Sequence, residues 1–262
     1  MSEAPVLLDV TGGIARITLN RPQMGNAIDL SMARALVEIA IRCQADESIR
    51  CVVLTGAGKL FCAGGDVRLF ESAGDNVGAL LDELAGTLHM AVARFARMEK
   101  PLLVLVNGPA AGAGLGLAAS GDVVIAGRSA HFTAAYGAIG LTPDGGASWL
   151  LPRLVGLRKA QEIILTNRRI KADEAEAIGL VTRTVDDDAL AEEGERMAAQ
   201  LADAAIGAIG AARNLLRQSF ESAFETQLER EVLSISRTGA SAEGREGLAA
   251  FLAKRPADFK GV

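Results

Sequence analysis

The segment Leu102-Leu103-Val104-Leu105-Val106 leads directly into Asn107-Gly108-Pro109-Ala110-Ala111-Gly112-Ala113-Gly114. Five consecutive apolar residues followed by a glycine-rich turn are typical of a strand that is buried on both faces. The same order occurs earlier, where the segment 50–54, apolar from Cys51 onward, is followed by Thr55-Gly56-Ala57-Gly58 and then by Ala63-Gly64-Gly65. Strand, glycine loop and helix in repeated succession predict an α/β fold with a parallel or mixed sheet.

The N-terminal part adds a hairpin and a helix to this prediction. Residues 6–10 and 14–19 are two largely apolar runs joined by Thr11-Gly12-Gly13, which is the pattern of a β-hairpin. Asp29 is suited to cap a helix over residues 30–44, because its side chain can accept a hydrogen bond from a free amide of the first turn.

The remainder of the chain becomes increasingly helical. Apolar residues recur at helical spacing from Leu81 to Phe95, and Val123-Val124-Ile125 has the character of another buried strand. After about Pro143 the pattern changes to helix after helix. We therefore expect an α/β core over residues 1–200 and a helical region over residues 201–262.

Composition narrows the class of protein. The chain has 262 residues, of which 50% are hydrophobic, and a net charge of -5, which disfavours binding to nucleic acid. No apolar run is long enough to span a membrane, and Met1 to Pro5 does not resemble the start of a secretion signal. Three scattered cysteines and two histidines indicate neither a disulfide framework nor a metal site. We expect a cytoplasmic protein without contacts to membranes or nucleic acid.

The two glycine loops, residues 63–65 and 108–116, are the strongest chemical signal. Glycine lets backbone amides approach a ligand closely, so two such loops can direct two N–H donors at one developing oxyanion. The same glycines are equally suited to tight turns and close packing of a helix on a sheet. Spacing alone leaves both interpretations open.

Five blocks of sequence carry a resemblance to a known family. They are Asn20-Arg21-Pro22 with Asn26-Ala27, Phe61-Cys62-Ala63-Gly64-Gly65-Asp66, Asn107-Gly108-Pro109-Ala110-Ala111-Gly112-Ala113-Gly114, Gly140-Leu141-Thr142-Pro143-Asp144-Gly145-Gly146, and Phe251-Leu252-Ala253-Lys254-Arg255. In this order they resemble the crotonase (enoyl-CoA hydratase/isomerase) superfamily over essentially the whole chain. The pattern is most similar to the isomerase type, including the 1,2-epoxyphenylacetyl-CoA isomerases.

The resemblance implies a fold, an assembly and a substrate. It implies a ClpP-like spiral of ββα units with a C-terminal helical trimerisation region, assembled as a homotrimer or as a hexamer made of two trimers. It implies an acyl-CoA thioester as substrate, with coenzyme A as part of that substrate and no metal or other cofactor required. It also implies an oxyanion hole formed by the backbone amides of Gly65 and Ala113. The coenzyme A path that it implies is lined by Asn26, Ala27, Ala63, Gly65, Asp66 and Val67.

The departures from the family pattern favour one reaction. Hydratases of the family place two carboxylates at the positions that match Gly116 and Tyr136 here, and neither residue is acidic. Asp144 remains, at a position where isomerases of the family place a catalytic carboxylate. One carboxylate is sufficient to move a proton between two carbons during a double-bond shift. Asp144 before Gly145-Gly146 also matches an ordinary helix N-cap, and the two roles are compatible.

Tyr136, His89 and Phe70 are the predicted substrate-pocket residues, and the Tyr136 hydroxyl is a possible donor to Asp144. The preferred function is an acyl-CoA isomerase that shifts a double bond, or rearranges an epoxide, through a stabilised enolate. Three alternatives stay open: an enoyl-CoA hydratase, a hydrolase similar to 4-chlorobenzoyl-CoA dehalogenase with His89 as base, and a non-catalytic coenzyme-A-binding protein.

Overall fold

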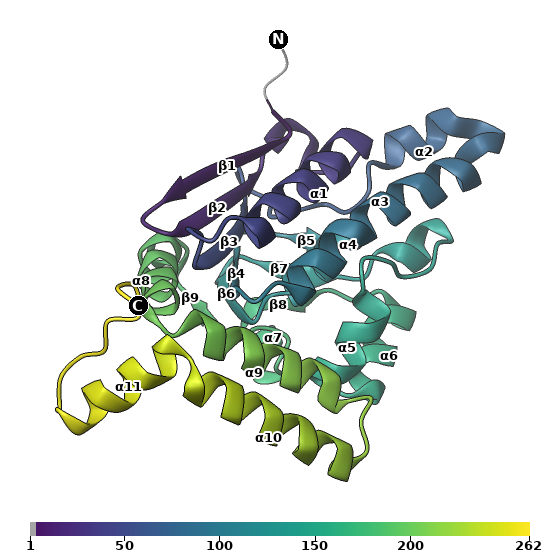
Figure 1. Ribbon diagram of the computed structural model, residues 1–262. Coiled ribbons are helices and arrows are strands. Elements are labelled where there is room, and N and C mark those ends of the chain that lie inside the picture. Colours follow the sequence, from purple (N-terminus) through teal and green to yellow (C-terminus); the bar gives the residue numbers. More distant parts are fainter. Residues whose placement is uncertain (1–3) are drawn as a thin grey trace.

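The predicted hairpin and apolar segments pair into one large sheet in the computed structural model, which describes residues 4–262 (Figure 1). The first three residues, which belong to the stretch examined for a secretion signal, lie outside the described part. The six strands are paired in the order β1-β2-β3-β4-β6-β9, antiparallel in the first pair and parallel afterwards. Their bounds are β1 Val6–Thr11, β2 Ile14–Leu19, β3 Cys51–Gly56, β4 Leu102–Val106, β6 Val123–Gly127 and β9 Arg183–Val185.

A smaller sheet and the helices complete the α/β fold that the sequence predicts. The small sheet has the order β5-β7-β8, with β5 Ala110–Ala111, β7 His131–Thr133 and β8 Ile170–Lys171. The α-helices are α1 Leu30–Ala45, α2 Val67–Ala73, α3 Val77–Arg97, α4 Ala113–Ala119, α5 Ala147–Val155, α6 Leu157–Thr166, α7 Ala172–Ala177, α8 Leu190–Asp203, α9 Ile206–Ser219, α10 Phe224–Ala240 and α11 Ala242–Leu252. Four short 3-10 turns are η1 Pro22–Met24, η2 Gly74–Asn76, η3 Tyr136–Ile139 and η4 Asp187–Ala189.

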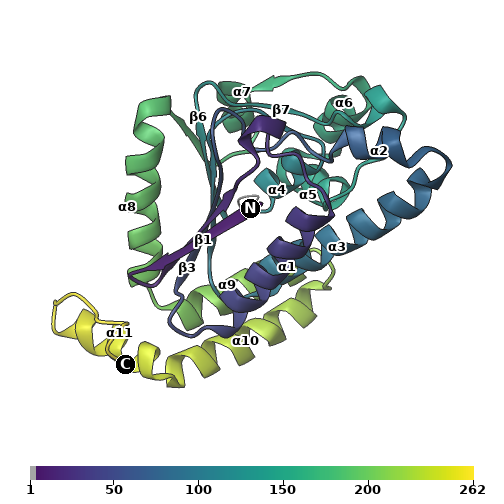
Figure 2. The same ribbon diagram turned by 90° about the horizontal axis from the view of Figure 1, so that it is seen from above.

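Both faces of the large sheet are covered by helices, which explains why its central strands are apolar at every position. Figure 2 shows α8 on one face and α1 with α3 on the other. Successive strand residues therefore enter different cores: Val104 of β4 packs on the side of α1 and α3, whereas Leu103 and Leu105 pack with α8. A polar side chain at any of these positions would leave a buried group without a partner.

Side-chain caps are present at two helix starts, and the first of them, at Asp29, is the one predicted from the sequence. The Asp29 carboxylate accepts a hydrogen bond of 2.8 Å from the amide of Met32 and caps α1. The Ser241 hydroxyl accepts one of 3.0 Å from the amide of Gly244 and caps α11. Each cap satisfies one of the free amides of a first helical turn, which stabilises a helix by about 1 kcal/mol.

The two glycine loops follow the carboxyl ends of β3 and β4 and lie against each other. The amides of Phe61 and Cys62 each donate a 3.2 Å hydrogen bond to the carbonyl of Pro109. Gly64 has a φ of +96°, and a Cβ built on it would lie 2.9 Å from the carbonyl oxygen of Ala111. The positive φ and the close contact both require glycine at position 64, because a side chain there would strain the backbone and collide with the second loop. The contact places the two loops at one edge of the sheet.

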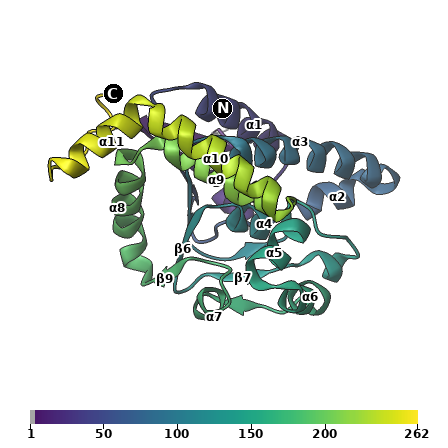
Figure 3. The ribbon, with the colours of Figure 1, turned by 60° about the horizontal axis from the view of Figure 1, so that its bottom comes forward.

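The C-terminal helices α9 and α10 run side by side below the sheet, and α11 projects away from it (Figures 1 and 3). Their outer surfaces carry many exposed apolar side chains. A domain boundary near residue 200 stays a prediction, although the chain is helical from α8 onward. None of the helices in the described residues 4–262 has the length and apolar character to cross a membrane.

Candidate active site

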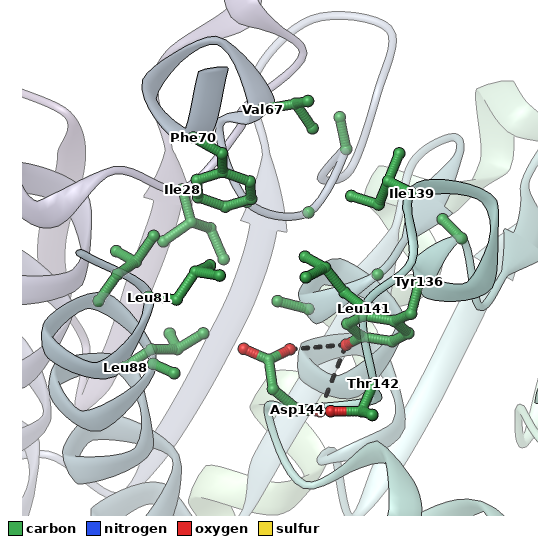
Figure 4. A pocket seen from close by; sticks show the side chains of 18 of the residues that line it. Ile28, Val67, Phe70, Leu81, Leu88, Tyr136, Ile139, Leu141, Thr142 and Asp144 are labelled. Atoms are coloured by element: carbon green, nitrogen blue, oxygen red, sulfur yellow. Dashed lines mark hydrogen bonds between the residues drawn. The ribbon is translucent and has the colours of Figure 1, made fainter. Parts of the chain in front are cut away.

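A cavity of about 420 Å³ opens between the glycine loops, helices α2 and α3, and the segment from η3 to α5 (Figure 4). Most of its lining is aliphatic or aromatic, and Asp144 is the one carboxylate among the described residues that line it. The lining residues are Ile28, Ala63, Gly64, Gly65, Val67, Phe70, Leu81, Leu84, Ala85, Leu88, Gly112, Ala113, Ala135, Tyr136, Ala138, Ile139, Leu141, Thr142 and Asp144. An apolar cavity with very few polar groups is typical of a small-molecule site.

Gly65 and Ala113, the predicted oxyanion donors, both line this cavity. Within the described part of the chain, neither backbone amide donates a hydrogen bond to another residue. Ala113 is the first residue of α4, where amides have no partner inside the helix. On either side of Gly65 the backbone is paired with Ile28: the Ile28 amide donates to the carbonyl of Gly64, and the Asp66 amide donates to the carbonyl of Ile28. The amide of Gly65 takes no part in this pairing. The fold thus leaves two free N–H donors at the wall of one apolar cavity.

Asp144 lies at the same cavity, held by the hydroxyl of Tyr136. The Tyr136 Oη donates a 2.7 Å hydrogen bond to Oδ1 of Asp144, and it lies 3.3 Å from the Asp144 carbonyl oxygen. This bond confirms the predicted contact between the two residues. Burial first, and then the charge of Asp144, raise the pKa of Tyr136, so its hydroxyl keeps its proton and remains a donor. The second carboxylate oxygen faces the apolar side chains of α3 across the cavity (Figure 4).

Asp144 does not cap helix α5, which was its other predicted role. The N-cap residue of α5 is Gly146, and within residues 4–262 the helix start has no side-chain cap. The carboxylate is instead turned toward Tyr136 and the cavity. The positive φ values of Gly145 and Gly146 explain this difference, because they bend the chain sharply between Asp144 and the helix.

The structure places His89 differently from the prediction. It is an exposed residue of α3 and is not among the described residues that line the cavity. Its Nε2 accepts a 3.0 Å hydrogen bond from the amide of Gly145, the residue after Asp144. His89 therefore contacts the loop that carries the carboxylate rather than a ligand in the pocket.

The residues of the predicted coenzyme A path occupy two different environments, and the path itself stays a prediction. Ala63 and Val67 line the cavity, as predicted. Asn26, by contrast, is completely buried, and its side-chain amide donates to the carbonyls of Ala57, Leu60 and Phe61. The side-chain amide of Asn26 is therefore used within the fold, and a place for Asn26 on the coenzyme A path stays a prediction.

Ala27 and Asp66 also make contacts within the fold. Ala27 is buried, and its carbonyl accepts a hydrogen bond from the guanidinium of Arg21. The same guanidinium lies 3.2 Å from a carboxylate oxygen of Asp66, whose side chain is almost fully buried. Together these contacts fasten the first glycine loop to the segment after β2. Sequence reasoning missed this function, because it requires knowing that residues far apart in sequence meet.

Gly116 is one of the two positions at which the resemblance described above implies a carboxylate in hydratases. A Cβ built on Gly116 would lie 2.7 Å from the carbonyl oxygen of Gly145, closer than real side chains approach a backbone. A glutamate at this position would therefore displace the loop that carries Asp144. The absence of an acid at residue 116 is thus built into the packing of α4 against that loop.

The aliphatic wall that α3 contributes to the cavity is the part that sequence reasoning did not find. Leu81, Leu84 and Leu88 line it from successive turns of α3, joined by Ile139 and Leu141 from the opposite side. Their helical spacing was visible in the sequence, where it indicated burial against the core. Leu84 and Leu88 satisfy both descriptions, because they are buried and also border the cavity.

The mostly parallel sheet, the adjoining glycine loops at the carboxyl ends of β3 and β4, and the C-terminal helices define a protein of the crotonase fold class. A family model for enoyl-CoA hydratase/isomerase matches residues 9–262. The chain belongs to this family, which confirms the predicted family and fold.

The 1,2-epoxyphenylacetyl-CoA isomerase of Escherichia coli K12 is 38% identical over 260 residues, covering 98% of each chain. The 2,3-dehydroadipyl-CoA hydratase of the same organism is 36% identical over 245 residues, covering 94% of each chain. The crystal structure of an enoyl-CoA hydratase from Polaromonas sp. JS666 has a TM-score of 0.93 at 31% identity, and the match covers 97% of this chain and 98% of that chain.

Proposed function

We propose that the protein is an acyl-CoA isomerase that shifts a carbon–carbon double bond, or rearranges an epoxide, next to a coenzyme A thioester. The observation that carries the proposal is the single carboxylate, Asp144, in an apolar cavity with two unused amides, those of Gly65 and Ala113. The amides stabilise the thioester oxygen as it becomes an enolate. Asp144 takes a proton from C2 of a 3-enoyl thioester and returns one to C4, leaving a 2-enoyl thioester. The reaction requires no metal or redox cofactor.

The acyl group that this cavity favours is apolar. Apart from Asp144, the side chains around it are uncharged, and the wall from α3 is formed by leucines and Ala85. A terminal carboxylate on the acyl chain would lose its hydration there without meeting a cation, which costs several kcal/mol. Hydrocarbon or aromatic acyl groups are therefore the proposed substrate class.

Two alternative reactions have less support from the geometry. Hydration in this family uses two carboxylates, and the packing of Gly116 against Gly145 leaves no space for one of them. A dehalogenase-like hydrolysis would use His89 as a base in the pocket. His89 lies outside the cavity lining, and its Nε2 lone pair is already occupied by the Gly145 amide.

The test is a product assay with the wild-type protein and two substrates, a linear 3-enoyl-CoA and its 2-enoyl isomer. We expect the 3-enoyl thioester to yield the 2-enoyl thioester, seen as rising ultraviolet absorbance of the conjugated product. Loss of the 2-enoyl absorbance with formation of a 3-hydroxyacyl-CoA would show a hydratase instead. Tight binding of both thioesters without any product would show the non-catalytic alternative.

We further propose that the protein assembles as a homotrimer, or as a hexamer of two trimers. The support is a broad apolar surface on the C-terminal helices, where Phe251 and Leu252 are each 81% exposed in the single chain. Apolar surface of this extent is characteristic of a protein interface. Light scattering after size exclusion should give three or six times the chain mass of 27.2 kDa. A monomeric mass would contradict the assembly while leaving the proposed reaction untouched.

A further inference from the structure

Two hydrogen bonds hold Asp144 and the residue that follows it, and neither partner is a residue that the proposed reaction requires as acid, base or oxyanion donor. The Tyr136 hydroxyl donates to Oδ1 of the carboxylate at 2.7 Å. The Nε2 of His89 accepts from the amide of Gly145 at 3.0 Å, immediately after Asp144 in the chain. One bond fixes the carboxylate itself, and the other fixes the backbone that carries it.

We infer that Tyr136 and His89 are positioning residues that make Asp144 a one-oxygen base. The inference rests on the proposed isomerase function. Oδ1 is held by Tyr136, so Oδ2, which faces the apolar wall of α3, is the oxygen that exchanges protons with the acyl chain (Figure 4). The same oxygen breaks the C2–H bond, keeps the proton while the double bond moves from C3–C4 to C2–C3, and forms the C4–H bond.

A fixed oxygen suits this reaction because C2 and C4 are separated by only one carbon. A carboxylate that rotated freely would present either oxygen, and its proton would have more opportunity to exchange with water before it returned to carbon. Correct placement of a reacting group within about 1 Å is worth as much as 10²-fold in rate. The two hydrogen bonds, from Tyr136 to Asp144 and from Gly145 to His89, are the tethers of the carboxylate. By fixing its position they increase the fraction of protons that return to the acyl chain.

Each of the two hydrogen bonds has a defined donor and acceptor. Tyr136 remains a donor because burial and the charge of Asp144 raise its pKa. In the second bond the Gly145 amide is the donor and the Nε2 lone pair of His89 is the acceptor. This arrangement also gives His89 a role in an enzyme that has no need of a second base.

Tyr136→Phe tests the first tether, because it removes the hydroxyl and keeps the ring that packs in the cavity. With a 3-enoyl-CoA carrying deuterium at C2, the wild type should deliver part of that deuterium to C4 of the product. In Tyr136→Phe we expect kcat to fall roughly 10- to 100-fold with KM changed less than about threefold. The fraction of deuterium at C4 should fall as well. An unchanged fraction, whatever the rate, would overturn the one-oxygen role of Asp144.

His89→Ala and His89→Gln test the second tether as a pair. The amide oxygen of glutamine can accept from Gly145 in place of Nε2, so His89→Gln should recover most of the kcat that His89→Ala loses. Hydrogen–deuterium exchange of the loop over residues 140–146 should rise in His89→Ala and not in His89→Gln. His131→Ala, at the other histidine, on strand β7, is the matched control and should change neither quantity. Equal behaviour of the two His89 variants would overturn the tether.

The two levels of failure are distinguishable. If the wild type does not isomerise the substrate, or if Asp144→Asn does so equally well, the proposed function fails and the positioning role fails with it. If the wild type isomerises with dependence on Asp144, but the Tyr136 and His89 variants retain its rate and its deuterium transfer, only the positioning role is overturned.

Discussion

Replacing Asp144 by asparagine is expected to lower kcat for double-bond isomerisation by about 10²–10⁴-fold, the range that general acid–base catalysis contributes. Asparagine has the size of the native side chain, and its amide oxygen can still accept the hydrogen bond from Tyr136. It cannot take a proton from carbon, because its amide is far too weak a base. KM should change little, since the cavity wall and the two backbone amides remain in place.

The control for this variant is Asp75→Asn, which changes an exposed carboxylate of η2 that does not belong to the described cavity lining. Both variants have the same change in charge, so a general electrostatic effect would appear in both. The melting temperature of Asp144→Asn should stay within a few degrees of the wild type, because the residue is only partly buried. Isomerisation at an undiminished rate in Asp144→Asn would place the base elsewhere and remove the main support for the proposed reaction.

Much of the architecture could be predicted because local sequence and tertiary structure agree. The residues of β4 are apolar at every position, and the structure places them between two helical layers. The cap at Asp29 could be predicted because its side chain bonds within its own helix turn. Glycine at position 64 is explained by a contact with the second loop, which the repeated loop pattern suggested but did not define.

The candidate site was less predictable, for a physical reason. Asn26 and His89 carry side chains that suit ligand binding or catalysis, yet both are engaged by backbone groups that are distant in the sequence. Residue type gives the chemistry that a side chain can perform, whereas only the fold shows which of its donors and acceptors are already used. The contact between Asp144 and Tyr136 could be anticipated, because the family resemblance places both residues at the same site.

The oxyanion hole is difficult to test by ordinary mutation, because its donors are backbone amides. Ala113 offers an exception. It is the first residue of α4, a position where proline is well accommodated and where the amide has no partner inside the helix. Ala113→Pro therefore removes one N–H donor without removing a hydrogen bond between described residues of the fold.

We expect Ala113→Pro to lower kcat for isomerisation by about 10²–10³-fold, the usual effect of deleting one oxyanion donor. The Gly65 amide and Asp144 would remain, so some activity should persist. Ala113→Val adds comparable bulk and keeps the amide, so the difference between the two variants isolates the lost donor from crowding near Gly145. The measurements are kcat and KM for the 3-enoyl thioester, with circular dichroism melting to verify folding. If the folded proline variant isomerises as fast as the valine variant, the Ala113 amide does not bind the developing oxyanion, and the free donors at this cavity serve another purpose.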